Sequence, residues 1–131
     1  MATFAIMRYA FPQKEKLKSK KLIDLLFTEG KSVTVYPLKL IYLRTTLPEN
    51  VKVQAGVTVS KRNFKSAVRR NRIKRLLRES YRLNKGQVFN NSDDTFAFLF
   101  LYLGKEMPNF GEIAPKMVEL LHKFLIKEKI H

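Results

Sequence analysis

Between residues 51 and 60 the chain places an apolar residue at every second position, in the order VKVQAGVTVS. Successive side chains of a strand point to opposite faces, so this pattern predicts a strand with one buried face. Residues 95–103 read TFAFLFLYL without such alternation, which predicts a strand buried on both faces. Residues 32–46 are rich in Val, Tyr, Leu and Ile and predict extended chain, with Pro37 at an edge or bend.

Two segments carry apolar residues at the spacing of an amphipathic helix. The first is predicted to begin after Ser19, a good N-cap residue, and to end before Gly30. Its apolar residues are Leu22, Ile23, Leu26 and Phe27. The second lies near the C-terminus, with Ile113, Met117, Leu120, Leu121 and Phe124. Residues 48–50 predict a turn and residues 90–94 a loop.

A third helix is predicted from about residue 66 to about residue 84. Its apolar face consists of Ile73, Leu76, Leu77 and Tyr81. Residues 61–82 contain a single acid, Glu79, and ten cations, which are Lys61, Arg62, Lys65, Arg69, Arg70, Arg72, Lys74, Arg75, Arg78 and Arg82. We define the basic stripe as Asn71, Arg75, Arg78 and Arg82. These residues follow at i, i+4, i+7 and i+11, so they share the face opposite the apolar one.

Such a stripe is either a solvated surface or a binding site for a polyanion. A face that serves only solubility mixes acids with bases, whereas almost nothing balances the charge here. Cations packed this closely repel one another until a partner neutralises them. The pattern therefore favours a polyanionic partner.

Composition agrees with this interpretation, because 26 Lys and Arg residues face 11 Asp and Glu residues in a chain of 131, a formal net charge of +15. This excess of positive charge favours nucleic acid as the binding partner, and an anionic membrane as the second choice. The outward face of the basic helix lacks Trp, Phe and Leu, which argues against a membrane-surface helix. The apolar run at residues 95–104 is too short to span a bilayer, and the N-terminus is not typical of a secretory signal. We expect a soluble cytoplasmic protein.

The predicted elements follow the order α-β-β-β-α-β-α, without internal repeats. This order predicts an α+β fold (an α/β sandwich), with a mixed, mostly antiparallel sheet of about four strands and three helices. A strand, a helix and another strand in succession favour a right-handed crossover by the general rule. Residues 1–14 are expected to form a loosely attached arm, and residues 15–131 a single RNA-binding domain.

The sequence contains no recognisable catalytic constellation. Its two histidines are His122, expected at the surface, and His131, the last residue. Asp93 and Asp94 form the only adjacent acidic pair, in a segment typical of a turn. A protein nuclease normally needs clustered carboxylates or paired acid and base groups. We therefore expect no catalytic residue and no dedicated metal site in the protein.

The string AVRRNRIKRLLRESYR at residues 67–82 resembles the signature of the bacterial ribonuclease P protein component. The resemblance extends to GVTVSKR at residues 56–62 and to FTEGKS at residues 27–32. Matching segments cover about residues 17–82, and the C-terminal third matches in pattern only. The usual glycine before the basic helix is replaced by residues 63–66.

This resemblance implies a ribosomal protein S5 domain 2-like fold with a left-handed βαβ crossover. It implies an accessory subunit of an endoribonuclease in which the RNA subunit performs Mg²⁺-dependent removal of the 5′ leader from precursor tRNA. The expected partners are ribonuclease P RNA and precursor tRNA, with Mg²⁺ bound through the RNA subunit and the substrate, and neither DNA nor a membrane. A ribosomal or general RNA-binding protein is the alternative that composition alone permits. DNA binding is weaker, because no second helix lies close enough for a helix-turn-helix.

The resemblance also assigns two sets of site residues. Those expected to bind the catalytic RNA are Lys61, Arg62, Arg70, Asn71, Arg72, Lys74, Arg75, Arg78 and Arg82. Those expected to bind the single-stranded leader are Ile23, Phe27, Lys31, Ser32 and Tyr42. An apolar and aromatic surface edged by cations suits single-stranded RNA. From the pattern alone, Ile23 and Phe27 could equally be ordinary core residues.

Overall fold

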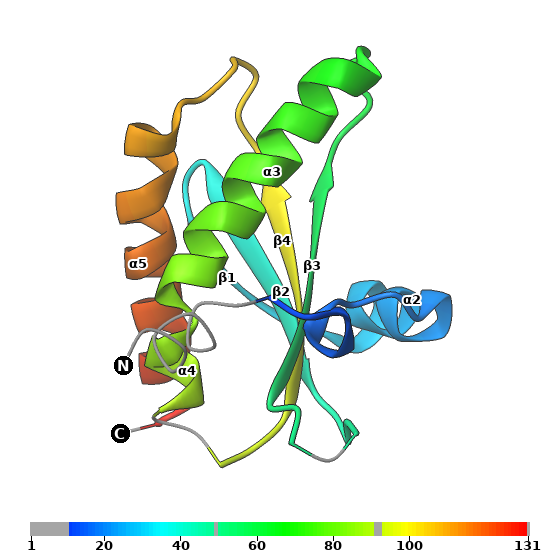
Figure 1. The fold of residues 1–131 in the computed structure, drawn as a ribbon, viewed down its shortest axis with the longest axis vertical. Coiled ribbons are helices and arrows are strands. Elements are labelled where there is room, and N and C mark those ends of the chain that lie inside the picture. Colours follow the sequence, from blue (N-terminus) through cyan, green and yellow to red (C-terminus); the bar gives the residue numbers. More distant parts are fainter. Residues whose placement is uncertain (1–10, 49, 91–92, 131) are drawn as a thin grey trace.

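The computed structural model describes residues 11–48, 50–90 and 93–130. A four-stranded sheet forms the centre of the molecule (Figure 1). Its strands are β1 (Lys31–Val35), β2 (Leu38–Arg44), β3 (Val53–Val59) and β4 (Phe96–Tyr102), in the spatial order β1-β2-β4-β3. The pairs β1–β2 and β2–β4 are antiparallel, and β3–β4 is parallel. This confirms the mixed, mostly antiparallel sheet.

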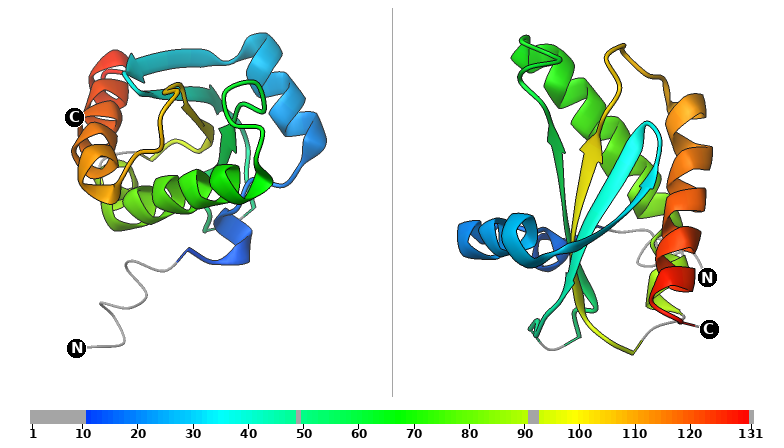
Figure 2. Two further views of the ribbon diagram at one scale, coloured as in Figure 1. Left: turned by 90° about the horizontal axis from the view of Figure 1, so that it is seen from above. Right: turned by 180° about the vertical axis from the view of Figure 1, so that it is seen from behind.

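Three long helices pack on the sheet, as predicted. They are α2 (Lys20–Glu29), α3 (Ala67–Asn84) and α5 (Phe110–Lys127). Figure 2 shows α3 and α5 on one side of the sheet and α2 on the other. The sequence did not predict two short additional helices, η1 (Gln13–Glu15) and α4 (Gly86–Phe89).

The β3-α3-β4 crossover is left-handed, against the general rule. In Figure 1 both strands point upward, α3 lies in front of the sheet, and β4 lies to the left of β3. The expectation drawn from the family resemblance therefore holds.

The sheet separates two apolar clusters of different size. The larger one fills the side covered by α3 and α5 and includes Phe96, Phe98 and Phe100 of β4. The smaller one lies under α2 and includes Leu26, Ile41 and Leu99. Neighbouring residues of β4 thus contribute to opposite clusters, which explains why this strand is apolar at every position.

The helix ends lie where the sequence predicts them, next to their capping residues. The hydroxyls of Ser19 and Ser66 accept hydrogen bonds from the backbone N–H groups of Leu22 and Arg69, at 3.2 and 3.4 Å. Both serines are therefore N-caps. Gly30 follows α2 with φ of −69°, so close packing, not a left-handed conformation, favours glycine there. A Cβ atom at this position would lie 2.8 Å from Cγ2 of Ile41.

Part of the expected N-terminal arm is packed on the domain. Residues 1–10 lie outside the described residues, but the Phe11 ring packs edge-on against Tyr81 with centroids 5.7 Å apart. The backbone N–H of Leu17 donates to the carbonyl of Ala55 in β3, at 2.9 Å. Of the expected arm the structure describes residues 11–14, and of these Phe11 packs on the domain.

A buried ion pair fastens this N-terminal segment to the end of α3. Nζ of Lys85 lies 2.6 Å from Oε1 of Glu15, and the two side chains are only 4% and 11% exposed. The pairing spans 70 positions in the sequence. Removing one partner of a buried pair leaves an uncompensated charge in the interior.

We therefore predict that Glu15→Ala and Lys85→Ala each lower the free energy of unfolding by about 3 kcal/mol. Urea unfolding followed by circular dichroism measures this loss. Glu79→Ala is the control, because its ion pair with Arg82 on the same helix is much more exposed and should contribute less than about 1 kcal/mol. Equally small losses for all three variants would contradict the prediction.

Candidate nucleic-acid interface

Helix α3 buries one face and exposes the other, as the sequence predicts. Ile73, Leu77 and Tyr81 are at most 1% exposed and belong to the main core, whereas Leu76 is only partly buried. The hydroxyl of Tyr81 is buried, and desolvation raises its pKa well above the ordinary value. The helix is therefore held firmly by its apolar side.

The basic stripe lies on the free side of α3, but its members differ. Asn71, Arg75 and Arg78 are exposed, whereas Arg82 is partly buried. Nε of Arg82 donates to Oε2 of Glu79 at 3.2 Å, and this hydrogen bond lowers the pKa of the Glu79 carboxyl. Glu79 therefore already neutralises part of the charge of Arg82, so the exposed arginines offer the stronger anion site.

The remaining cations expected to bind RNA surround the N-terminal half of α3. Lys61, Arg62 and Arg72 are exposed, and Lys74 is partly buried. Val68, in the first turn, is 69% exposed, a feature that the sequence interpretation missed. An apolar side chain among cations offers contact to a sugar or a base beside the phosphates.

Arg70 has a structural role that the sequence did not reveal. Its Nη1 atom donates to the backbone carbonyls of Phe64 and Lys65, at 2.8 and 2.9 Å. Phe64 is 5% exposed, and its ring lies 6.0 Å from that of Tyr102. Arg70 and Phe64 therefore order residues 63–66, the segment that replaces the glycine usual in the family.

The second predicted surface is only partly formed as expected. On α2, Leu26 is 1% exposed and Phe27 is 57% exposed. Ile23 is partly buried against the smaller cluster. Phe27 is thus a surface residue, and the alternative that places it in the core is wrong.

Tyr42 and Lys31 do not belong to this surface. They are paired across β1 and β2, and Tyr42 is 1% exposed within the core under α5. Its hydroxyl donates to Oε2 of Glu128 at 2.7 Å, and Nζ of Lys31 lies 3.8 Å from the same atom. Burial, followed by this hydrogen bond, raises the pKa of Tyr42 far above its ordinary value. The expectation that both residues share a surface with Ile23 and Phe27 is corrected.

The alternation along β2 identifies the residues that lie on the α2 side of the sheet, where Tyr42 and Lys31 were expected. Ile41 belongs to the cluster under α2, so Lys39, two positions earlier, points to the same side of the sheet. Ser32 pairs with Ile41 and is exposed on that side. A shift of one position in a strand turns a side chain to the other face, which explains why sequence reasoning selected Tyr42 and missed Lys39 and Ile41.

A groove along the edge of the sheet connects the two surfaces. It has a volume of about 240 Å³ and runs beside β3. Its lining includes Lys16, Lys18, Ile23, Gly56, Lys74 and Arg78. Side chains from α2 and from the basic helix α3 therefore meet in one hollow, with cations on both sides.

Other site types find little support in the described part of the chain. Residues 11–48, 50–90 and 93–130 contain no group of three or more His, Cys, Asp or Glu side chains able to hold a metal ion. His122 is exposed on α5, and His131 lies outside the described residues. No helix within the described ranges is both long and apolar enough to cross a membrane.

Comparisons with known proteins agree with this geometry. The family model for ribonuclease P matches residues 11–125. The ribonuclease P protein component of Porphyromonas gingivalis is 33% identical over 116 residues, covering 86% of this chain and 85% of the relative. That of Chlorobium phaeobacteroides is 35% identical over 127 residues, covering 87% of each chain.

A solved structure supports the same assignment. The ribonuclease P protein from Thermotoga maritima superimposes with a TM-score of 0.67 at 25% identity, covering 83% of this chain and 96% of that chain. The residues matched by the family model, 11–125, include α2, β3 and α3, which carry the basic stripe and the groove. The chain belongs to the family of bacterial ribonuclease P protein components.

Proposed function

We propose that the protein is the subunit of ribonuclease P that binds the catalytic RNA and the single-stranded 5′ leader of precursor tRNA. In this way it assists Mg²⁺-dependent endonucleolytic removal of the leader. The observation that carries the proposal is the exposed basic face of α3, which meets the apolar surface of α2 in one groove.

The catalytic RNA is proposed to bind the N-terminal half of α3 and the loop before it. Arg72, Arg75 and Arg78 form no ion pair with another described residue, and their guanidinium groups suit bidentate contacts to phosphate. Asn71 adds a side-chain amide for phosphate or sugar. Arg70 contributes indirectly, because it holds the loop carbonyls of Phe64 and Lys65.

The leader is proposed to follow the α2 side of the sheet. Phe27 offers an exposed ring for base stacking, and Ser32 and Lys39 extend the surface toward β1 and β2. The groove continues this surface toward Lys18 and Lys74. Apolar and aromatic platforms edged by cations bind flexible single strands through their bases and phosphates.

Catalysis is proposed to belong to the RNA partner, with Mg²⁺ bound by that RNA and the substrate. The cations gathered on α3 attract phosphates and reduce the repulsion between two RNA molecules. An RNA-dependent enzyme then needs less Mg²⁺ to bring substrate and catalyst together. The protein is an accessory subunit in this proposal.

The first test is a processing assay with precursor tRNA at limiting Mg²⁺. We predict that the protein alone leaves the substrate intact and that it stimulates cleavage by ribonuclease P RNA, most clearly at low Mg²⁺, because it supplies positive charge and not a catalyst. Efficient cleavage by RNA-free protein would contradict the proposal. Binding without stimulation would favour a general RNA-binding protein.

The second test concerns the basic stripe. Arg75→Ala and Arg78→Ala should each weaken binding to ribonuclease P RNA and reduce the magnitude of its salt slope by about one unit or less. Both variants should fold normally, since both side chains are exposed. Lys123→Ala on α5 is the control, because it removes one exposed cation away from α3, and the Nζ atom of Lys123 donates to the backbone carbonyl of Thr34 and not to an acid. Unchanged affinity and slope in both arginine variants would identify the stripe as a solvated face.

The third test concerns the leader. Phe27→Ala should weaken binding of the holoenzyme to precursor tRNA by at least about fivefold, since base stacking contributes roughly 1–3 kcal/mol. Affinity for mature tRNA should not change. Lys31→Ala is the control, because Lys31 lies on the opposite side of the sheet beside Glu128. Equal losses for both substrates, or a loss with Lys31→Ala alone, would leave the proposed leader surface without support.

A further inference from the structure

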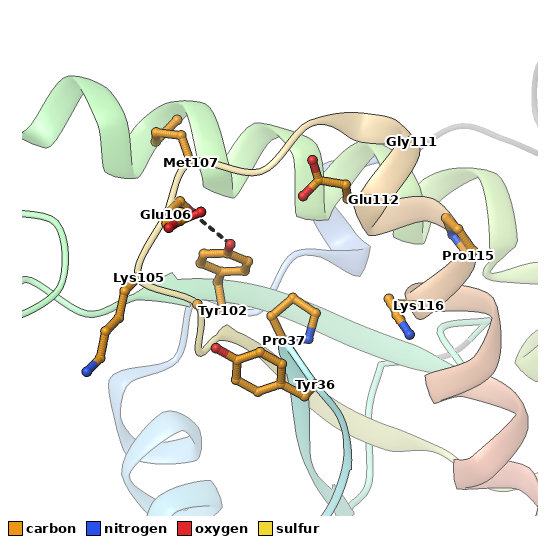
Figure 3. A pocket seen from close by; sticks show the side chains of 11 residues that line it. Tyr36, Pro37, Tyr102, Lys105, Glu106, Met107, Gly111, Glu112, Pro115 and Lys116 are labelled. Carbon is orange, nitrogen blue, oxygen red and sulfur yellow. Dashed lines mark hydrogen bonds between the residues drawn. The ribbon is translucent and has the colours of Figure 1, made fainter.

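A second and larger hollow lies at one end of the sheet, away from the groove. It has a volume of about 710 Å³ and is bounded by the β1–β2 turn, the loop after β4 and the first turns of α5. Figure 3 shows Tyr36 and Pro37 close to Tyr102, with Glu112 and Lys116 projecting from α5 on the other side. We call this hollow the tip pocket. Its volume falls in the range of small-ligand sites.

Tyr36 offers the tip pocket a flat apolar surface. Tyr36 is 65% exposed, so most of its large, mainly apolar ring is accessible to a ligand. The turn that carries it is anchored, because the backbone N–H of Leu103 donates to the carbonyl of Pro37 at 2.7 Å. A ring on an anchored turn can accept a stacked base without first becoming ordered.

The loop after β4, which forms the wall beside Tyr36, is also ordered in advance. The hydroxyl of Tyr102 donates to the carbonyl of Glu106 at 2.7 Å (Figure 3), and this fixes the loop after β4. Gly104 packs so closely that a Cβ atom would lie 2.9 Å from Cε2 of Tyr102. The Tyr102 ring also contacts Phe64, so the pocket adjoins the loop that carries Lys61 and Arg62.

The charges around the pocket have both signs, unlike those of α3. Glu106 and Glu112 line it, together with Lys105 and Lys116. Glu112 is held in place, since its Oε1 accepts from Nδ2 of Asn109 at 2.7 Å. Neither lysine forms an ion pair with another described residue. Glu112 also has a structural role, because its backbone N–H donates to Oδ1 of the N-cap residue Asn109 at the start of α5. Glu106 forms no ion pair with another described residue.

We propose that the tip pocket binds one unpaired RNA nucleotide whose base carries an exocyclic amino group. The base stacks on Tyr36, and its amino group donates to a carboxylate of Glu106 or Glu112, the pairing that acidic side chains make with cytosine N4. The lysines at the rim meet the flanking phosphates. The inference rests on the proposed function only in taking RNA as the partner, and it adds a site separate from the basic stripe and the leader surface.

The binding test uses the ¹⁵N-labelled full chain, titrated by NMR with CMP, UMP and inorganic phosphate. CMP and UMP differ at position 4 of the base, where cytosine carries an amino group and uracil a carbonyl, and at N3, which accepts a hydrogen bond in cytosine and donates one in uracil. CMP should shift the amides of Tyr36, Lys105 and Gly111 in a saturable way, with an affinity at least about fivefold above that of UMP. Phosphate alone should not shift Tyr36. Equal affinities for CMP and UMP, or a shift of the Tyr36 amide with phosphate alone, would overturn the proposal.

Three variants assign the interaction to its residues. Tyr36→Ala should lower CMP affinity by at least about fivefold, and Tyr36→Phe should retain it because the ring remains. Glu106→Gln should reduce the preference for CMP over UMP. Ile126→Ala is the control, as this side chain is 64% exposed elsewhere on α5. Wild-type CMP affinity in Tyr36→Ala would refute the stacking platform.

Two further outcomes are decisive. A proline-rich peptide that shifts the same amides when CMP does not would assign the pocket to a protein partner and overturn the proposal. Because the titration needs no ribonuclease P RNA, its failure is distinct from that of the proposed function. If CMP does not bind while Arg75→Ala still weakens binding to ribonuclease P RNA, the tip-pocket proposal is wrong. If CMP binds while Arg75→Ala leaves RNA binding unchanged, the proposed function is wrong.

Discussion

The architecture depends on β4, a strand that is apolar at every position because both of its faces are covered. It pairs antiparallel with β2 and parallel with β3, so it fixes the register of the strands on both sides. Its phenylalanines face α3 and α5, and Ala97 and Leu99 face α2. The hydrophobic contribution of these side chains stabilises two layers at once. The sheet thereby separates a thick side, which carries the basic helix, from a thin side, where a single helix leaves the sheet partly open.

Local patterns were sufficient for the three long helices and for β3, because their periodicity is unambiguous. Capping serines, an apolar stripe and a strict alternation each involve neighbours in the sequence. Residues 38–43 are different, since Leu40, Ile41, Tyr42 and Leu43 are all apolar and conceal which face each one occupies. Only the pairing with β1 and β4 decides that Tyr42 enters the core and Ile41 lies under α2. The pairing of Glu15 with Lys85 was equally hidden, because 70 positions separate the two residues.

The structure also divides the cations into those with an internal role and those facing solvent. Arg70 holds a loop, Arg82 binds Glu79, and Lys85 binds Glu15. Lys123 and Lys127 donate to carbonyls of β1, at 2.8 and 2.7 Å, and so cover carbonyls of an edge strand that could otherwise pair with another chain. The net charge of the sequence therefore overstates the number of cations that are available to bind a partner. The cations that remain for a polyanion concentrate on the free face of α3 and around the groove.

The groove changes how the two proposed RNA sites relate to each other. Arg78 belongs to the basic stripe and also lines the groove, and Ile23 of α2 lines the same groove. A folded RNA on α3 and a flexible strand on the α2 side would therefore meet along β3, where Gly56 has no side chain to block either one. Continuous positive potential over such a path reduces the repulsion between two polyanions that approach the same edge. In a protein this small, proximity of the two sites makes the charge of each available to both, so the proposed function would place Arg78 and Lys74 between catalyst and substrate.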